Sequence, residues 1–196
     1  VYLESYFPGL PSYSRMVQYM GDALLPLLYF FKVCCLGKAT GKQFVDSCPL
    51  VVCHNRRIHN HKTFKGIAKR GKTSVGWFFG FKLHLIINDI GQIISFFITP
   101  GNVSDKNREL MFKLSKGVWG KLFGDKGYVS GPLKEDLQKI GIELITKMKK
   151  NMKPKPISLF DKLVLKKRGI IECAIDGLKN QAYIEHSRHR SSVGFM

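Results

Sequence analysis

The chain has 196 residues, and because 32 Lys and Arg outnumber 14 Asp and Glu its formal net charge is +18. A composition of 44% hydrophobic and 12% aromatic residues excludes a disordered basic tail, and the length suits one domain with a hydrophobic core. Such an excess of positive charge repels itself unless a polyanion neutralises it, so nucleic acid is the expected partner.

A membrane partner and a disulfide framework are not expected. The longest apolar stretch, residues 23–36, contains Pro26 and Lys32 and is shorter than the roughly 20 residues that cross a bilayer, so we interpret it as a buried helix or core segment. The cysteines are odd in number and show no CxxC spacing, which favours a reducing cytoplasm. The residues that invite a zinc interpretation lack the paired short spacings of structural zinc sites: Cys48, Cys53, His54, His59 and His61.

The predicted elements begin with helices and continue with strands. Residues 7–12 form a breaker cluster ahead of a helix towards Met20, which Ser12 or Ser14 can cap. Strands are expected at residues 43–48, 77–87, 93–99, 121–124 and 143–146. Later helices are expected at residues 105–114, 131–140 and 168–184. Three consecutive strands followed by alternation predict an α/β fold, with a mixed five-stranded sheet flanked by helices after an N-terminal helical segment.

Three of the few carboxylates occupy positions where a solvated surface role is not expected. Asp46 has apolar neighbours on both sides, Asp125 ends a predicted strand, and Glu172 lies in an apolar run of the last predicted helix. Strand ends and the helix over them form the usual ligand crevice of such sheets, so the three carboxylates can converge there. Clustered carboxylates need a cation to stay ionised, and oxygen ligands select Mg²⁺ or Mn²⁺, in a two-ion site suited to in-line attack on phosphate.

The last predicted helix carries its charges on one stripe. With Arg168 at 0°, Glu172 lies at about 40° and Lys179 at about 20° around the helix axis, away from the apolar residues. Simpler interpretations stay open at this point. Asp46 and Asp125 can be turn or capping acids, and Arg168 with Glu172 can be an ordinary ion pair of residues four apart.

Several linked stretches of the chain resemble one known family. They are residues 44–47 (FVDS), 53–59 (CHNRRIH), 64–72 (FKGIAKRGK), 76–84 (GWFFGFKLH), 99–103 (TPGNV), 122–128 (LFGDKGY) and 184–191 (IEHSRHRS). In these the chain resembles the DDE transposases of bacterial insertion sequences, specifically the insertion-sequence-982 group, from Tyr6 to Phe195. The resemblance implies a ribonuclease-H-like catalytic domain.

By this resemblance Asp46, Asp125 and Glu172 are the three catalytic, metal-binding acids. The family signature Tyr-x2-Arg-x3-Glu-x6-Lys is met at Arg168, Glu172 and Lys179, whereas Leu165 stands at the Tyr position. The implied activity is Mg²⁺-dependent cleavage and strand transfer at the ends of an insertion sequence, with Mn²⁺ as the alternative ion. The implied partners are duplex DNA, as terminal inverted repeats and as target, and further copies of the chain in the active complex.

The family has an N-terminal helical region and a C-terminal hydrophobic helix beyond the matched stretch. We therefore expect a copy truncated at both ends, with a helical lead-in at residues 1–40 and the catalytic domain at residues 41–196. The expected location is the bacterial cytoplasm, at the nucleoid.

Two basic segments are expected to contact phosphates. Residues 54–72 carry seven Lys and Arg and no acid, and residues 146–168 carry nine against Asp161. The residues predicted to bind DNA are Arg56, Arg57, Lys65, Lys69, Arg70, Lys126, Arg168, Lys179, Arg188 and Arg190. Two alternatives stay open: a DNA-binding remnant without catalysis, and a cellular nuclease on the same fold.

Overall fold

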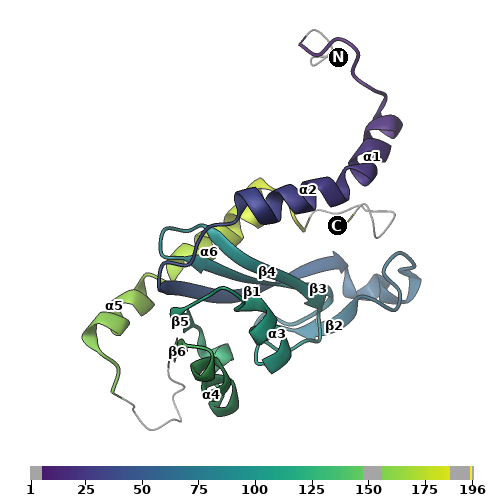
Figure 1. Cartoon of the computed structure of the whole chain (residues 1–196). Helices are drawn as coiled ribbons and strands as arrows, with labels where there is room; N and C mark the ends of the chain where they lie inside the picture. The colour runs from purple at the N-terminus through teal and green to yellow at the C-terminus, as the bar shows by residue number, and fades with distance from the viewer. Residues whose placement is uncertain (1–5, 148–155, 186–194, 196) are drawn as a thin grey trace. The chain divides into compact units, whose positions relative to one another are not determined.

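The computed structural model describes residues 6–147, 156–185 and 195 (Figure 1). Contacts between Cα atoms divide the chain into two units, with one unit ending at Cys35 and the other beginning at Leu36. The first unit contains α1 (Tyr13–Asp22), α2 (Leu24–Phe30) and the π-helical turn η1 (Phe31–Cys35). Oγ of Ser12 accepts a hydrogen bond from the Arg15 N–H, as a capping residue does. None of these helices has a buried residue, so the prediction of a buried segment at residues 23–36 is wrong; the sheet core is built from later residues.

The second unit is built on a six-stranded mixed sheet. Its strands are β1 (Lys42–Cys53), β2 (Lys69–Lys72), β3 (Trp77–Asn88), β4 (Ile93–Pro100), β5 (Gly120–Gly124) and β6 (Ile142–Thr146). β1 and β3 are antiparallel neighbours at the centre, and β2 and β4 pair end to end along the other edge of β3. β5 pairs parallel to β1, and β6 parallel to β5. The predicted α/β, ribonuclease-H-like mixed sheet is thereby confirmed, with β2 as a strand that the sequence did not predict.

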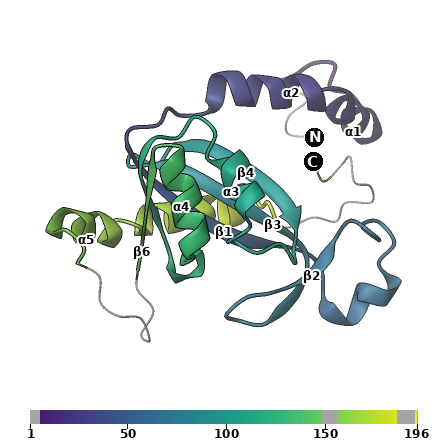
Figure 2. The same ribbon diagram turned by 60° about the horizontal axis from the view of Figure 1, so that its bottom comes forward.

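Helices cover both faces of this sheet (Figure 2). They are α3 (Arg108–Leu114), α4 (Gly131–Lys139), α5 (Leu159–Lys166) and α6 (Gly169–Asp176). Three short turns complete the unit: η2 (Asn55–Asn60), η3 (Lys126–Tyr128) and η4 (Gly177–Gln181). The single helix predicted at residues 168–184 is therefore α6 followed by the π-helical turn η4, and α5 was not predicted.

Side chains that alternate along the strands fill two separate cores. Val45 and Ile86 pack with Met111 of α3 and Leu133 of α4 on one face. The adjacent residues on the same strands, Phe44 and Leu85, pack on the other face. There they meet residues of the two C-terminal helices, among them Val164, Leu165 and Ile171. Since successive strand residues point to opposite faces, the position of any polar residue in β1 follows from this alternation.

Candidate active site

The sheet register places two of the three predicted acids side by side. The parallel pairing of β1 with β5 ends at Phe44 opposite Phe123. Asp46 and Asp125 each come two residues later, so both follow the pairing at equal distance and lie on the face of Phe44 and Phe123. That face is the one covered by α6, which carries Glu172. Asp46 lies inside the long strand β1 rather than at its end, and the prediction of a strand ending at residue 48 is corrected in that respect.

One guanidinium group bridges all three carboxylates. Nη2 of Arg168 lies 3.0 Å from Oδ2 of Asp46 and 2.8 Å from Oε1 of Glu172, and Nη1 lies 3.0 Å from Oδ1 of Asp125. Arg168 immediately precedes α6 and is buried, with its side chain 11% exposed, whereas that of Glu172 is 63% exposed. The sequence predicted the contact with Glu172; the contacts with Asp46 and Asp125, which lie far away in the chain, come from the fold.

Burial changes the acidity of Asp46. Removal from water raises the pKa of its carboxyl group above the ordinary value, and the charges of Asp125 and Asp105 act in the same direction. The N–H of Ser47, which donates to Oδ1 of Asp46 at 2.9 Å, and the charge of Arg168 oppose this rise in the pKa. Burial therefore favours the neutral form of Asp46, and the charge of Arg168 favours its ionised form.

The three acids supply the kind of donor atoms, carboxylate oxygens, that a divalent metal ion binds. In the described part of the chain, no group of three or more His, Cys, Asp or Glu residues is arranged to hold a metal ion, and Arg168 lies among the three acids. The donors themselves are three carboxylates gathered around one cation, which is the ligand set that Mg²⁺ and Mn²⁺ prefer.

A fourth acid, Asp105, lies behind Asp46 on the opposite face of the sheet. Its Oδ1 accepts a hydrogen bond from Oγ of Ser47 at 2.7 Å and lies 3.3 Å from Nζ of Lys82. Nδ1 of the fully buried His84 is 3.7 Å from the same oxygen. Burial lowers the pKa of His84 to about 4, against the pull of the Asp105 charge. The sequence contained one sign of this network, an acid closely following the Pro100–Gly101–Asn102 turn, but it did not single out Asp105.

The residues predicted to bind DNA are spread over several elements. Lys126 is exposed directly after Asp125, and Nζ of Lys179 pairs with Oε1 of Glu185 at 3.1 Å rather than with Glu172. Arg168 is buried among the three acids, and five further predicted cations are exposed in the segment between β1 and β3: Arg56, Arg57, Lys65, Lys69 and Arg70. Arg188 and Arg190 lie outside the described residues. The DNA contacts of all these residues stay predictions.

A family model described as a transposase DDE domain matches residues 36–192, which is most of the chain and all of the sheet with its acids. The chain belongs to the DDE transposase family. This confirms the family predicted from the sequence. The finer assignment to the insertion-sequence-982 group, and the roles of the individual acids, stay predictions.

Comparison with solved structures gives a more distant similarity. A cryo-EM structure of the piggyBac transposase synaptic complex with hairpin DNA matches at 14% sequence identity and a TM-score of 0.46. The match covers 70% of this chain and 29% of the piggyBac transposase chain, so this chain spans less than a third of that protein. No curated protein matches the chain. Among the described residues no helix has the length and hydrophobicity needed to cross a membrane.

Proposed function

We propose that this chain is the catalytic domain of a DNA transposase that cleaves the ends of a bacterial insertion sequence and joins them to target DNA. The observation that carries the proposal is the convergence of Asp46, Asp125 and Glu172 on one guanidinium from three separate elements. We further propose that the element belongs to the insertion-sequence-982 group and that the chain acts at the nucleoid in the bacterial cytoplasm.

In this proposal the three carboxylates hold two Mg²⁺ or Mn²⁺ ions. Bound at these carboxylates, such ions would supply activation of a water or 3′-hydroxyl nucleophile and stabilisation of the charge at phosphorus during in-line displacement. Arg168 separates from some of its carboxylate partners and contacts DNA phosphates together with Lys126 and Lys179. The substrates are the terminal inverted repeats and a target duplex, and the active complex contains more than one copy of the chain.

The test is metal-dependent nicking of a duplex that carries the inverted repeat. Asp46→Asn keeps the size of the side chain and removes its charge, and we expect nicking to fall by at least about a hundredfold because the ion site loses a ligand. The matched control is Asp136→Asn on α4, which belongs to the opposite face of the sheet and pairs with Arg108. Nicking by Asp46→Asn at the rate of the unmodified chain contradicts the proposal.

A second candidate is a DNA-binding module without catalysis. The observation that favours it is that a cation of the protein, Arg168, already contacts all three acids and offsets part of their negative charge. This candidate predicts DNA binding that is the same with and without Mg²⁺ and that is unchanged in Glu172→Gln.

A further inference from the structure

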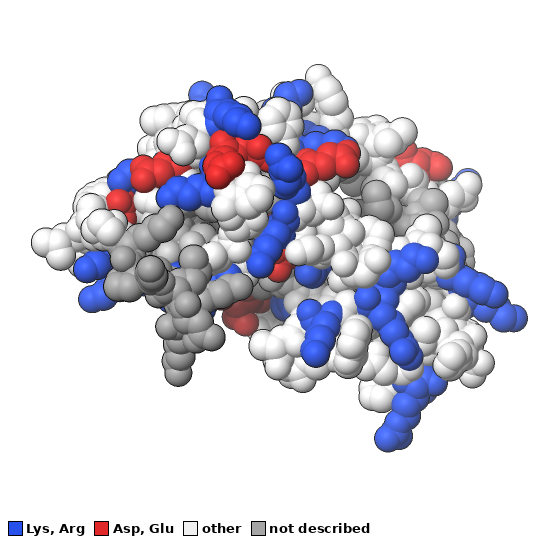
Figure 3. All heavy atoms as spheres, turned by 90° about the horizontal axis from the view of Figure 1, so that it is seen from below, with Lys and Arg blue, Asp and Glu red and all other residues white. Residues whose placement is uncertain are grey.

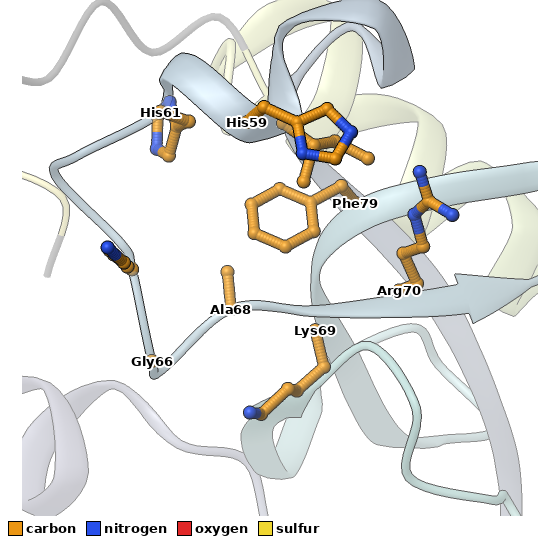
Figure 4. Close-up of a pocket in the computed structure, with 9 residues that line it drawn as sticks. His59, His61, Gly66, Ala68, Lys69, Arg70 and Phe79 are labelled. Atoms are coloured by element: carbon orange, nitrogen blue, oxygen red, sulfur yellow. The ribbon is translucent and has the colours of Figure 1, made fainter.

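The basic segment between β1 and β3 folds around a pocket of about 450 Å³ (Figure 4). Part of its lining is apolar and comes from Ile58, Ala68 and Phe79. Lys65, Lys69 and Arg70 contribute cations, and their side chains are exposed. The volume lies within the roughly 300–1,000 Å³ usual for sites that bind small molecules. The pocket therefore combines an apolar floor with a positive rim.

Aromatic packing fixes the floor of this pocket. The ring of His61 stacks on Phe64 with centroids 5.4 Å apart and meets Phe79 edge-on at 6.0 Å. Phe64 in turn meets Phe81 edge-on at 5.5 Å, which ties this segment to the central strand β3. The floor is thereby anchored to the sheet, so the pocket is held in place by the domain core.

Two imidazoles stand beside this floor. His59 is exposed at the pocket, and Nε2 of His61 is buried without a hydrogen-bond partner in the described part of the chain. A buried polar nitrogen without a partner costs free energy. A ligand in the pocket, which His61 lines, can supply the missing hydrogen bond.

We propose that this pocket takes one unpaired nucleotide of a DNA single strand. A nucleobase is a flat apolar ring with polar edges, which suits the floor and the two imidazoles. The phosphates on either side of the nucleotide suit Lys65, Lys69 and Arg70. Arg56 and Arg57 lie on the same segment outside the pocket lining and can contact the phosphates of neighbouring nucleotides. A free nucleotide offers no such neighbours, so we assign the site to a strand.

The pocket is separate from the proposed catalytic acids. Phe79 of its floor and Leu85, the β3 residue opposite Asp46, are six positions apart in β3, which corresponds to roughly 20 Å along the strand. The inference rests on the proposed function, because it assigns the pocket to DNA handled by the same domain. The acids, however, take no part in the binding proposed here.

The test compares three DNA probes with the full chain by fluorescence anisotropy: a twelve-nucleotide oligothymidylate, an abasic strand of equal length, and a duplex. The abasic strand keeps every phosphate and lacks the bases. We expect the normal strand to bind about five- to tenfold more tightly than the abasic strand, because one base stacks in the pocket. His59→Ala and His61→Ala should reduce this preference and leave binding of the abasic strand unchanged.

The matched control is Arg56→Ala, which removes a cation outside the pocket lining and should weaken both single strands by the same factor. His61→Ala also removes packing against Phe64 and Phe79, so His59→Ala, at an exposed position, serves as the variant that keeps the fold. Equal affinity for normal and abasic strands overturns the inference, as does a base preference unchanged in both histidine variants. If the chain does not nick duplex DNA but still prefers the normal strand over the abasic strand, the proposed function is contradicted and the inference about the pocket is not.

Discussion

At the scale of single residues, Arg168 joins the three acids that we propose to be catalytic. The sequence placed it four residues before Glu172, where an ordinary exposed ion pair was the simplest interpretation. In the structure its guanidinium also contacts Asp46 and Asp125, and its side chain is only 11% exposed. Without it, three carboxylates would face one another with no cation of the protein between them.

We predict that Arg168→Gln lowers the free energy of unfolding by about 2–4 kcal/mol, because a partly buried Asp46 is left without its partner. Arg168→Lys keeps the charge, but an ammonium group is a point charge without the guanidinium fork, so it should recover only part of this loss. The measurement is urea unfolding without divalent metal, with Lys167→Gln at the exposed neighbouring position as control. A loss as small for Arg168→Gln as for Lys167→Gln would show that the three contacts contribute little.

His84 gives the protein a pH dependence of its own. Burial lowers the pKa of its imidazole from 6.5 to about 4 in the folded chain, so between these values the unfolded chain binds more protons. The contribution of neutral His84 to the free energy of unfolding is fully present above about pH 6.5 and is lost as the pH falls towards about 4. We expect the free energy of unfolding to decrease by roughly 3 kcal/mol over this interval.

The measurement is urea unfolding at a series of pH values from 7 to 4, with His84→Gln as the matched variant. The glutamine side chain does not titrate, so the difference between the two chains isolates the histidine from other groups such as Asp46. Parallel pH profiles for the two chains would contradict the lowered pKa.

At the scale of elements, β1 and β5 build the site through their register, and α5 supports the residue that bridges it. α5 begins after Ser158, whose Oγ accepts a hydrogen bond from the N–H of Asp161 at 3.0 Å. Asp161 pairs with Nζ of Lys121 in β5 at 2.7 Å, so the cap also links α5 to the sheet. Two residues after α5 ends, Arg168 enters the acid cluster.

We predict that Ser158→Ala destabilises the domain by about 1 kcal/mol, because the first turn of α5 loses its cap. Lys162→Ala, at an exposed position in the same helix, should change the stability by less than about 0.5 kcal/mol. Chemical unfolding followed by circular dichroism measures both variants. Equal midpoints for the two variants would argue against a stabilising cap.

The elements that the sequence missed were missed for physical reasons. β2 is four residues with three cations and Gly71, and it forms because its backbone pairs with residues 77–80 of β3. The local sequence has no pattern of alternating apolar residues that would predict such a strand. α5, by contrast, did carry a signal: Ser158 with Asp161 three residues later, before an apolar run, is a helix-start pattern. Our prediction for residues 146–168 was only a basic segment that contacts phosphates.

At the scale of the whole molecule, positive charge dominates. Figure 3 shows one face on which Lys and Arg are spread widely, whereas Asp and Glu gather mainly in its upper part. Several acids are already paired, as in Lys42 with Asp89 and Arg108 with Asp136. Most of the formal charge of +18 is therefore available to a polyanion.

We predict that the affinity for duplex DNA falls by at least about a thousandfold between 50 and 200 mM salt, because phosphate contacts release condensed counterions. Anisotropy titrations of one labelled duplex at four salt concentrations measure the slope. A random-sequence duplex should show the same slope, since phosphate contacts carry no sequence information. A flat response would remove the electrostatic account of DNA binding.

The sequence by itself determined the DDE transposase family, the mixed α/β sheet and the preference for a polyanionic partner, because these follow from short motifs, strand and helix patterns and composition. Only the tertiary structure decided that Arg168 bridges Asp46, Asp125 and Glu172, that Asp105 lies behind them across the sheet, and that a basic segment closes around a pocket. These contacts join residues far apart in the chain, and their distances depend on strand register and on which face each side chain takes. No local pattern contains that information.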